Sequence, residues 1–143
     1  MATAGTVEEP SPTAQTPKGL RVLLVEDQAD CAAGLAMVLR GDGHAVRVAA
    51  DGPAALDAAR AVQPDVVLLD IGLPGGMDGY EVAKRLHGQK AAKKPLLVAV
   101  TGFGGEADRQ QSAQVGIDLH LVKPADLDAL LRLLRRFQRI IEP

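Results

Sequence analysis

Cysteine, aromatic residues and long apolar runs are all scarce in this chain of 143 residues. The single cysteine, Cys31, excludes an internal disulfide framework and fits a reducing compartment. No apolar run approaches the roughly 20 residues that a membrane span needs, and the N-terminus lacks the order of a signal peptide. These absences predict a cytoplasmic protein with a core of Leu, Val, Ile and Ala, in which we expect Cys31 to be buried.

An excess of charge is absent too. The formal net charge is −2, which provides no electrostatic attraction to nucleic acid or to an anionic membrane. Residues 1–18 contain three prolines and almost no large apolar side chain, so they are predicted to be a disordered tail. Residues 19–141 are long enough to form one domain with its own core.

From residue 20 onward, short apolar runs alternate with stretches rich in Ala and Leu. The runs predict strands over 20–25, 45–49, 65–70, 96–100 and 118–122. The stretches between and after them predict helices over 30–40, between Asp51 and Pro64, from about 78, over 106–115 and over 126–140. Five such βα units predict an α/β fold with a doubly wound, five-stranded parallel sheet, but they do not determine the strand order. His44 and His87 are expected at the surface.

The run over 66–70 is apolar up to its last residue, Asp70, and this predicts a strand that is buried on both faces. Ligands of open α/β sheets bind at the carboxyl ends of the strands. Asp70 therefore occupies a position where chemistry is common. Taken alone, it is equally consistent with an aspartate that caps the following turn.

Acidic residues also follow the first predicted strand, where Glu26 and Asp27 stand. In a parallel sheet these carboxylates and Asp70 converge on one edge. At about 5 Å and an effective dielectric constant of 20, each pair repels by about 3 kcal/mol. Such a cluster favours a bound cation, and oxygen ligands without His or Cys select Mg²⁺ or Mn²⁺ rather than zinc.

Thr101 and Lys123 end the last two predicted strands and so reach the same edge. A hydroxyl and a cation are groups that bind the oxygens of a phosphoryl group. Aspartate is a known phosphoryl-accepting nucleophile. The pattern therefore predicts metal-assisted phosphorylation of Asp70.

The ordered set Glu26-Asp27, Asp70, Thr101-Gly102 and Lys123-Pro124, with Met77-Asp78-Gly79 after the acidic strand, resembles a receiver domain of two-component response regulators. The resemblance extends over about residues 20–140. It implies a flavodoxin-like fold with strand order 2-1-3-4-5. It also implies a signalling switch rather than an enzyme, apart from removal of its own phosphoryl group.

The resemblance further implies a role for each site residue. Asp70 would accept the phosphoryl group from a histidine kinase or a histidine phosphotransfer protein. Mg²⁺ would be held by Glu26, Asp27, Asp70 and the backbone carbonyl of Gly72. Thr101 would move towards the phosphoryl oxygens, and Lys123 would neutralise their charge.

The sequence departs from the family pattern at two places. Receiver domains commonly have one residue between the Pro and the Met-Asp-Gly, whereas Gly75 and Gly76 make two here. The family often has Tyr or Phe at the position of His120, where the aromatic ring swings inward on activation. His120 can rotate as well, but it has less apolar area and titrates. It is equally consistent with a strand residue that has no switching role.

The last predicted helix carries more apolar width than one contact with a sheet requires. Leu127, Leu130, Leu131, Leu134 and Ile141 form its expected core face. Leu133, Phe137 and Ile140 form a second stripe, which we interpret as a surface for a protein partner or for a homodimer, in conjunction with the 106–115 helix and the last strand. Packing of this stripe under the loop of the predicted 106–115 helix is the alternative. A basic stripe lies beside them, but the acidic balance does not favour DNA.

Other classes fit less well. A phosphatase with a D-x-D motif would require an acid at Gly72, and a P-loop would require Gly-Lys-Ser/Thr after a glycine-rich turn. A phosphate-relay intermediate, or a receiver excised from a hybrid histidine kinase, remains the main alternative to a stand-alone switch. A scaffold that is not phosphorylated would be expected to lack a site residue, and none is missing.

Overall fold

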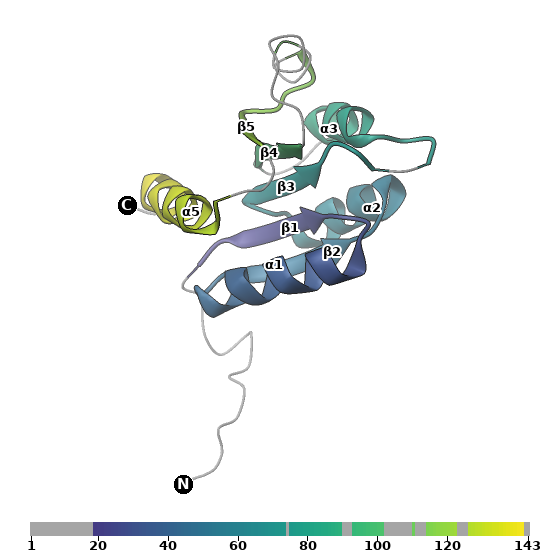
Figure 1. Cartoon of the computed structure of the whole chain (residues 1–143). Helices are drawn as coiled ribbons and strands as arrows, with labels where there is room; N and C mark the ends of the chain where they lie inside the picture. Colours follow the sequence, from purple (N-terminus) through teal and green to yellow (C-terminus); the bar gives the residue numbers. More distant parts are fainter. Residues whose placement is uncertain are drawn as a thin grey trace, which may run out of the picture.

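The computed structural model describes residues 19–73, 75–89, 93–101, 110, 114–122 and 126–141. Five parallel strands form one sheet in the order β2-β1-β3-β4-β5 (Figure 1). The strands are β1 (Arg21–Val25), β2 (Ala45–Ala49), β3 (Val66–Asp70), β4 (Leu96–Thr101) and β5 (Leu119–Val122). The helices are α1 (Ala29–Gly41), α2 (Gly52–Val62), α3 (Gly79–Gly88) and α5 (Leu127–Ile141). The α/β class and the strand order are confirmed.

Some predictions fall outside the described residues. They concern the tail over 1–18, most of the helix over 106–115, the Gly102–Gly105 loop and Lys123 with Pro124. Among the described helices, none is long and apolar enough to cross a membrane.

Helices cover both faces of the sheet and define two core clusters (Figure 1). Side chains of α2 and α3 pack on one face, which includes Val67 and Leu69 of β3. Side chains of α1 and α5 pack on the other, which includes Val66 and Leu68. Successive residues of a strand point to opposite faces, so all five residues of the central strand β3 are buried. This rigid strand carries Asp70 to the edge of the sheet.

Aspartate side chains cap three of the helices at their N-termini. Asp51 accepts from Ala54 N (2.9 Å), and Asp126 accepts from Ala129 N (3.1 Å). Asp78 accepts from Glu81 N at 2.9 Å, so α3 begins at Gly79. Each cap satisfies a backbone donor that the helix itself leaves without an acceptor. The cap at Asp78 thereby sets where the loop after Asp70 ends.

The expectation that Cys31 is buried is wrong. The buried residues of α1 are Ala32, Ala36 and Leu39, whereas Cys31 is exposed. Successive residues of an α-helix are rotated by about 100°, and the packed face is centred one position after Cys31. Its thiol donates a hydrogen bond to Gln28 Oε1 at 3.2 Å.

The surface position expected for His44 is also wrong, because this residue is only 4% exposed. Its Nδ1 accepts a hydrogen bond from Leu20 N at 3.0 Å, and its Nε2 lies 3.7 Å from Asp42 Oδ2. Asp42 in turn accepts from Arg135 of α5, with 3.0 Å between Nε and Oδ2. The buried His44 is therefore linked to the residue before β1, and through Asp42 of the α1–β2 turn to the exposed Arg135 of α5. His87 is exposed, as predicted.

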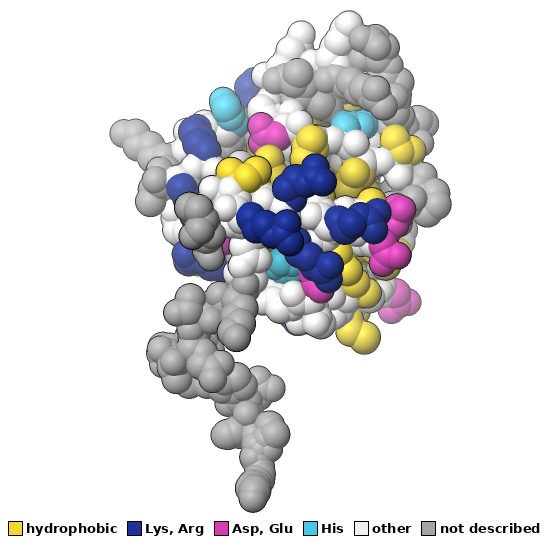
Figure 2. Space-filling view, turned by 90° about the vertical axis from the view of Figure 1, so that its left-hand side faces the viewer, with side chains coloured by type: hydrophobic (Ala, Val, Ile, Leu, Met, Phe, Trp, Pro, Cys, Tyr) yellow, Lys and Arg dark blue, Asp and Glu magenta, His cyan; other side chains and the backbone are white. Residues whose placement is uncertain are grey.

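The packing face of α5 is rotated relative to the prediction. Leu130 and Leu134 are buried as expected, but Leu127 and Ile141 are 41% and 39% exposed. Leu133 and Phe137 are instead partly buried against the second core cluster. Of the second stripe, Ile140 is the strongly exposed residue, at 69%. The exposed side of α5 also carries Arg132, Arg135, Arg136 and Arg139, and Lys and Arg side chains gather at the centre of this face in Figure 2.

Candidate functional site

Three carboxylates meet where β1 and β3 end. Asp70 is the last residue of β3, and Glu26 and Asp27 directly follow β1, its hydrogen-bonded neighbour. One carboxylate oxygen of each lies within 4.8 Å of those of the other two. Asp70 is 8% exposed, Glu26 is partly buried and Asp27 is exposed. The convergence predicted from the sequence is therefore present, and we call these three residues the acidic cluster.

Backbone N–H groups hold two of these carboxylates. Gly72 N donates to Asp70 Oδ1 at 2.9 Å, and Gln28 N donates to Glu26 Oε2 at 3.1 Å. The loops after β3 and β1 therefore fix the orientation of these two carboxylates.

Thr101 completes the described part of this edge. It is the last residue of β4 and is 5% exposed. The backbone of β3 is joined to β4 here by Ile71 N, which donates to Val100 O at 3.2 Å. Thr101 is paired in register with Val122, the last residue of β5, which directly precedes Lys123 in the sequence. Lys123 itself lies outside the described residues.

The donor set of the acidic cluster fits a hard divalent cation. Its three carboxylates offer only oxygen, which suits Mg²⁺ or Mn²⁺, and it contains none of the nitrogen or sulfur ligands that zinc prefers. The ligand atoms lie within 4.8 Å of one another, which makes the three side chains a group that could hold one ion. Gly72 is exposed next to Asp70, and its N–H contacts the carboxylate.

His120 lies on β5, opposite Ala99 of β4 in the register. Both of its ring nitrogens are buried and, in the part of the chain that the structure describes, have no hydrogen-bond partner. Leaving buried polar groups without partners costs about 1–3 kcal/mol each. Burial of the His120 ring therefore has a free-energy cost that an exposed strand residue would not have.

The sequence did not identify the contacts that support the acidic cluster from behind. Glu26 N donates to Ala49 O at the end of β2, at 3.0 Å. Met77 packs against Gly52, the first residue of α2. Such contacts depend on the fold, and Gly52 next to the capping Asp51 is the only local signal that a close approach could occur there.

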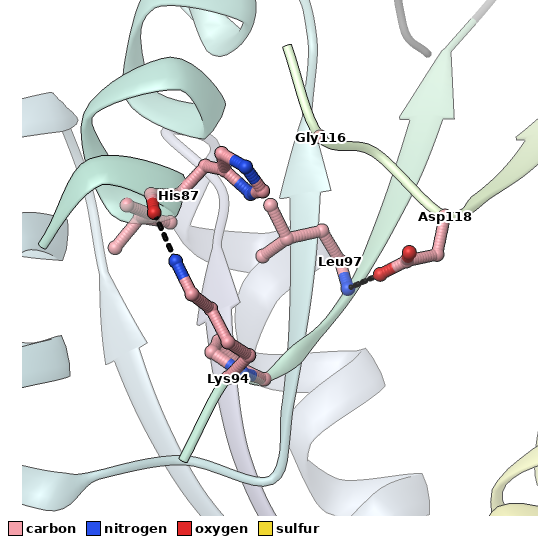
Figure 3. Close-up of a pocket in the computed structure, with 7 residues that line it drawn as sticks. His87, Lys94, Leu97, Gly116 and Asp118 are labelled. Carbon is pink, nitrogen blue, oxygen red and sulfur yellow. Dashed lines mark hydrogen bonds between the residues drawn. The ribbon is translucent and has the colours of Figure 1, made fainter. Parts of the chain in front are cut away.

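A hollow of about 220 Å³ lies away from this site, among Leu86, His87, Lys94, Pro95, Leu97, Gly116 and Asp118 (Figure 3). Two of its polar side chains, Lys94 and Asp118, are already used within the protein. Lys94 Nζ donates to the carbonyl oxygen of His87, and Asp118 Oδ2 accepts from Leu97 N at 2.9 Å. A Cβ at Gly116 would lie 2.6 Å from His87 Nδ1. These contacts join the end of α3 to the segments before β4 and β5, which is a structural role.

Comparisons with known proteins agree with the geometry. The sequence model of the response regulator receiver domain matches residues 22–135. The transcriptional regulatory protein TcrA of Mycobacterium tuberculosis is 40% identical over 121 residues, which are 85% of this chain and 47% of that protein. The response regulator PleD of Caulobacter vibrioides is 35% identical over 125 residues, 85% of this chain and 27% of that protein.

The fold also matches a solved structure of the chemotaxis protein CheY4 of Vibrio cholerae. The TM-score is 0.76 at 31% identity, and the match covers 82% of this chain and 97% of that one. A parallel sheet with an acidic cluster at its carboxyl edge, together with these matches, defines a signalling domain of the two-component type. The chain belongs to the response regulator receiver domain family. It spans less than half of the length of TcrA and PleD.

Proposed function

We propose that this receiver domain is a switch in which Asp70 accepts a phosphoryl group from a phosphohistidine of a histidine kinase or a phosphotransfer protein. The observation that supports this most strongly is the meeting of Glu26, Asp27 and Asp70 oxygens within 4.8 Å at the edge of the sheet. A cluster of like charges costs free energy in the isolated protein. Its presence at the end of a buried strand is accounted for by a ligand that needs it.

In the transfer, an oxygen of the Asp70 carboxylate forms a bond to phosphorus, and the bond from phosphorus to the imidazole nitrogen breaks. The imidazole leaves with the electron pair. A bound Mg²⁺ would neutralise charge on the phosphoryl oxygens. Glu26, Asp27, Asp70 and the Gly72 carbonyl are the residues that we propose to hold it. The Gly72 N–H keeps the Asp70 carboxylate in one orientation, which in-line attack requires.

Thr101 and Lys123 are proposed to bind the phosphoryl oxygens after transfer. The burial of Thr101 at the end of β4 supports its part, since β4 ends at the same edge of the sheet as β3, which ends at Asp70. A charged donor such as Lys123 would compensate for the negative charge that phosphorylation adds.

The test uses acetyl phosphate and Mg²⁺ with intact-mass measurement. We expect the wild-type protein to gain one phosphoryl group, and Asp70→Asn to gain none. Asp30→Asn is the matched control, because Asp30 is an exposed acid in the first turn of α1 and does not belong to the acidic cluster. No gain in the wild type, even with a cognate kinase, would contradict the proposal, and an unchanged gain in Asp70→Asn would exclude Asp70 as the acceptor.

We propose that the output is carried by the surface of β5 and α5, together with the predicted 106–115 helix, through a protein partner or a homodimer. Among the described residues of α5, the exposed Ile140 and the arginines beside it support a protein interface more than the half-buried Leu133 and Phe137 do. Ile140→Glu should therefore reduce association of the phosphorylated protein, as measured by light scattering or by capture of its partner, and leave the fold intact. Leu133→Glu should unfold it. Unchanged association in Ile140→Glu would contradict this surface.

His120 is proposed to contribute to the switch by rotation. The two buried ring nitrogens, for which the described residues provide no hydrogen-bond partner, support this. A rotation that exposes the ring would supply water as a partner. NMR of the His120 ring signals with and without phosphorylation tests the proposal. Identical signals in the two states would assign His120 a purely structural role.

A further inference from the structure

The loop after β1 is supported by the end of β2. Glu26 N donates to the carbonyl oxygen of Ala49, the last residue of β2, at 3.0 Å. Two residues later Asp51 begins the cap of α2, and Gly52 is the first helical residue. The position of Glu26 is therefore linked to the β2–α2 connection.

The loop after β3 is closed at its base. Gly79 N donates to Ile71 O at 3.1 Å. A Cβ at Gly79 would lie 2.5 Å from Ile71 Cα and 2.7 Å from Asp70 O, so only glycine allows this approach. Between these ends, no described residue lies within 4 Å of where a Cβ would be on Gly75 or Gly76. The glycine pair that distinguishes this chain from the family pattern therefore makes no close approach to described residues like the one that Gly79 makes.

Met77 provides the contact that the glycine pair lacks. A Cβ at Gly52 would lie 2.5 Å from Met77 Sδ, 2.9 Å from its Cγ and 3.1 Å from its Cβ. Met77 is partly buried against the first core cluster, and Gly52 is buried. The missing side chain of Gly52 thus leaves the space in which Met77 packs. The same two residues border a hollow of about 360 Å³ together with Asp51, Pro53, Gly75, Gly76 and Arg85.

We propose that Met77, packed on Gly52, is a positioning residue for the acidic cluster. The Met77 side chain joins two segments. One is the loop after Asp70, which contains Gly72, and the other is the β2–α2 connection, which supports Glu26. Without this contact, the long glycine-containing loop would sample more conformations, because each glycine adds backbone freedom. The contact acts on the site only through the two loops. The inference rests on the proposed function of the acidic cluster as a Mg²⁺ site.

The test compares Gly52→Ala, Met77→Ala and the double variant in the full chain. Mg²⁺ affinity is measured by calorimetry, and the exchange rate of the Gly72 amide is measured by NMR in the metal-free protein. Groups that orient metal ligands typically change affinity by 10–100-fold when mutated, and we expect each single variant to raise the Kd for Mg²⁺ about tenfold. Each should also accelerate exchange of the Gly72 amide.

The double variant distinguishes one shared contact from two separate effects. If the methyl group that Gly52→Ala adds acts by displacing Met77, removing the Met77 side chain first should leave Gly52→Ala with little further effect. Gly76→Ala is the matched control in the same loop, because its Cβ would meet nothing within 4 Å. It should change the Kd less than twofold. Met77→Leu, which keeps an apolar side chain of similar volume, should recover most of the affinity.

The outcomes separate the inference from the proposed function. If the wild type binds Mg²⁺ and both single variants bind it equally well while remaining folded by circular dichroism, the positioning role is wrong. Additive effects in the double variant would also overturn it. If the wild type binds no Mg²⁺, the proposed metal site fails, and the Gly72 exchange rates still decide whether Met77 holds the loop.

Discussion

At the amino edge of the sheet, where the strands begin, two aspartates join neighbouring segments of the fold, whereas at the carboxyl edge three carboxylates gather beside one another. Asp65, just before β3, accepts from Arg21 N at 2.7 Å and pairs with Lys93. Asp118, just before β5, accepts from Leu97 N. At the opposite edge, the oxygens of the acidic cluster lie within 4.8 Å of one another. The same residue type therefore joins segments of the fold at one edge and forms the acidic cluster, for which we propose a chemical role, at the other.

The largest expected effect is at the amino edge. Asp65→Asn should lower the free energy of unfolding by about 2 kcal/mol, because the amide removes a charge-assisted bond and leaves Lys93 without its partner. Lys93 is 42% exposed, which keeps the loss below that of a fully buried pair. Urea unfolding measures the change.

Asp57→Asn is the control for this measurement. Asp57 also pairs with a cation, Arg60, but both side chains are exposed. Exposed pairs contribute little, so we expect a change within about 0.5 kcal/mol. Equal losses in the two variants would show that pairing at the amino edge has no special importance for stability.

The second expected effect is a pH dependence of the free energy of unfolding, which originates at His44. Burial holds the pKa of His44 below its usual value, and the charge of Arg135 lowers it further, against the opposing attraction of Asp42. The unfolded chain therefore binds a proton more readily than the folded one. The stability that this neutral histidine provides is fully present above the ordinary pKa, about 6.5, and is lost as the pH falls towards the lowered folded pKa.

In that range the free energy of unfolding should decrease by up to about 1.4 kcal/mol per pH unit. His44→Asn serves as the reference, since its amide oxygen can accept from Leu20 N but does not titrate. Unfolding curves of both proteins between pH 7.5 and about 5 would show the difference in slope. Asp42, whose pKa is held low chiefly by its hydrogen bond from Arg135, titrates below this range. If the free energy of unfolding changed with pH equally in the wild type and in His44→Asn, the assignment of the pH dependence to His44 would be wrong.

These two edges also show what the sequence could predict. Asp70, Glu26, Asp27 and Thr101 were identified because each follows an apolar run, and parallel strands bring their ends together. The strand order came from the family resemblance, because hydrophobic periodicity contains no information about which strands are neighbours. Lys123, which the same reasoning identified, stays a prediction.

The residues that the sequence missed are defined by contacts between distant segments. The burial of His44 depends on Leu20 and on Arg135, which binds Asp42 across 93 residues. The packing of Met77 depends on Gly52 having no side chain. On α5, the helical period correctly predicted that Leu130 and Leu134 are buried. Which residues lie at the centre of the packing face depends on how the helix packs against the sheet. None of these features leaves a local pattern of residues.

The smallest expected effect, and the one that tests the carboxyl edge directly, comes from Asp27→Asn. Removing one of three like charges should raise the free energy of unfolding of the metal-free protein. Asp27 is exposed, so solvent screening limits the gain to about 1 kcal/mol. The same substitution should remove most of the stabilisation that excess Mg²⁺ gives to the wild type, since a ligand that binds only the folded state stabilises it by mass action. Asp30→Asn, outside the acidic cluster, should change neither quantity. If Asp27→Asn instead destabilised the metal-free protein, as Asp65→Asn is expected to do, its carboxylate would serve the fold, and the contrast between the two edges would not hold.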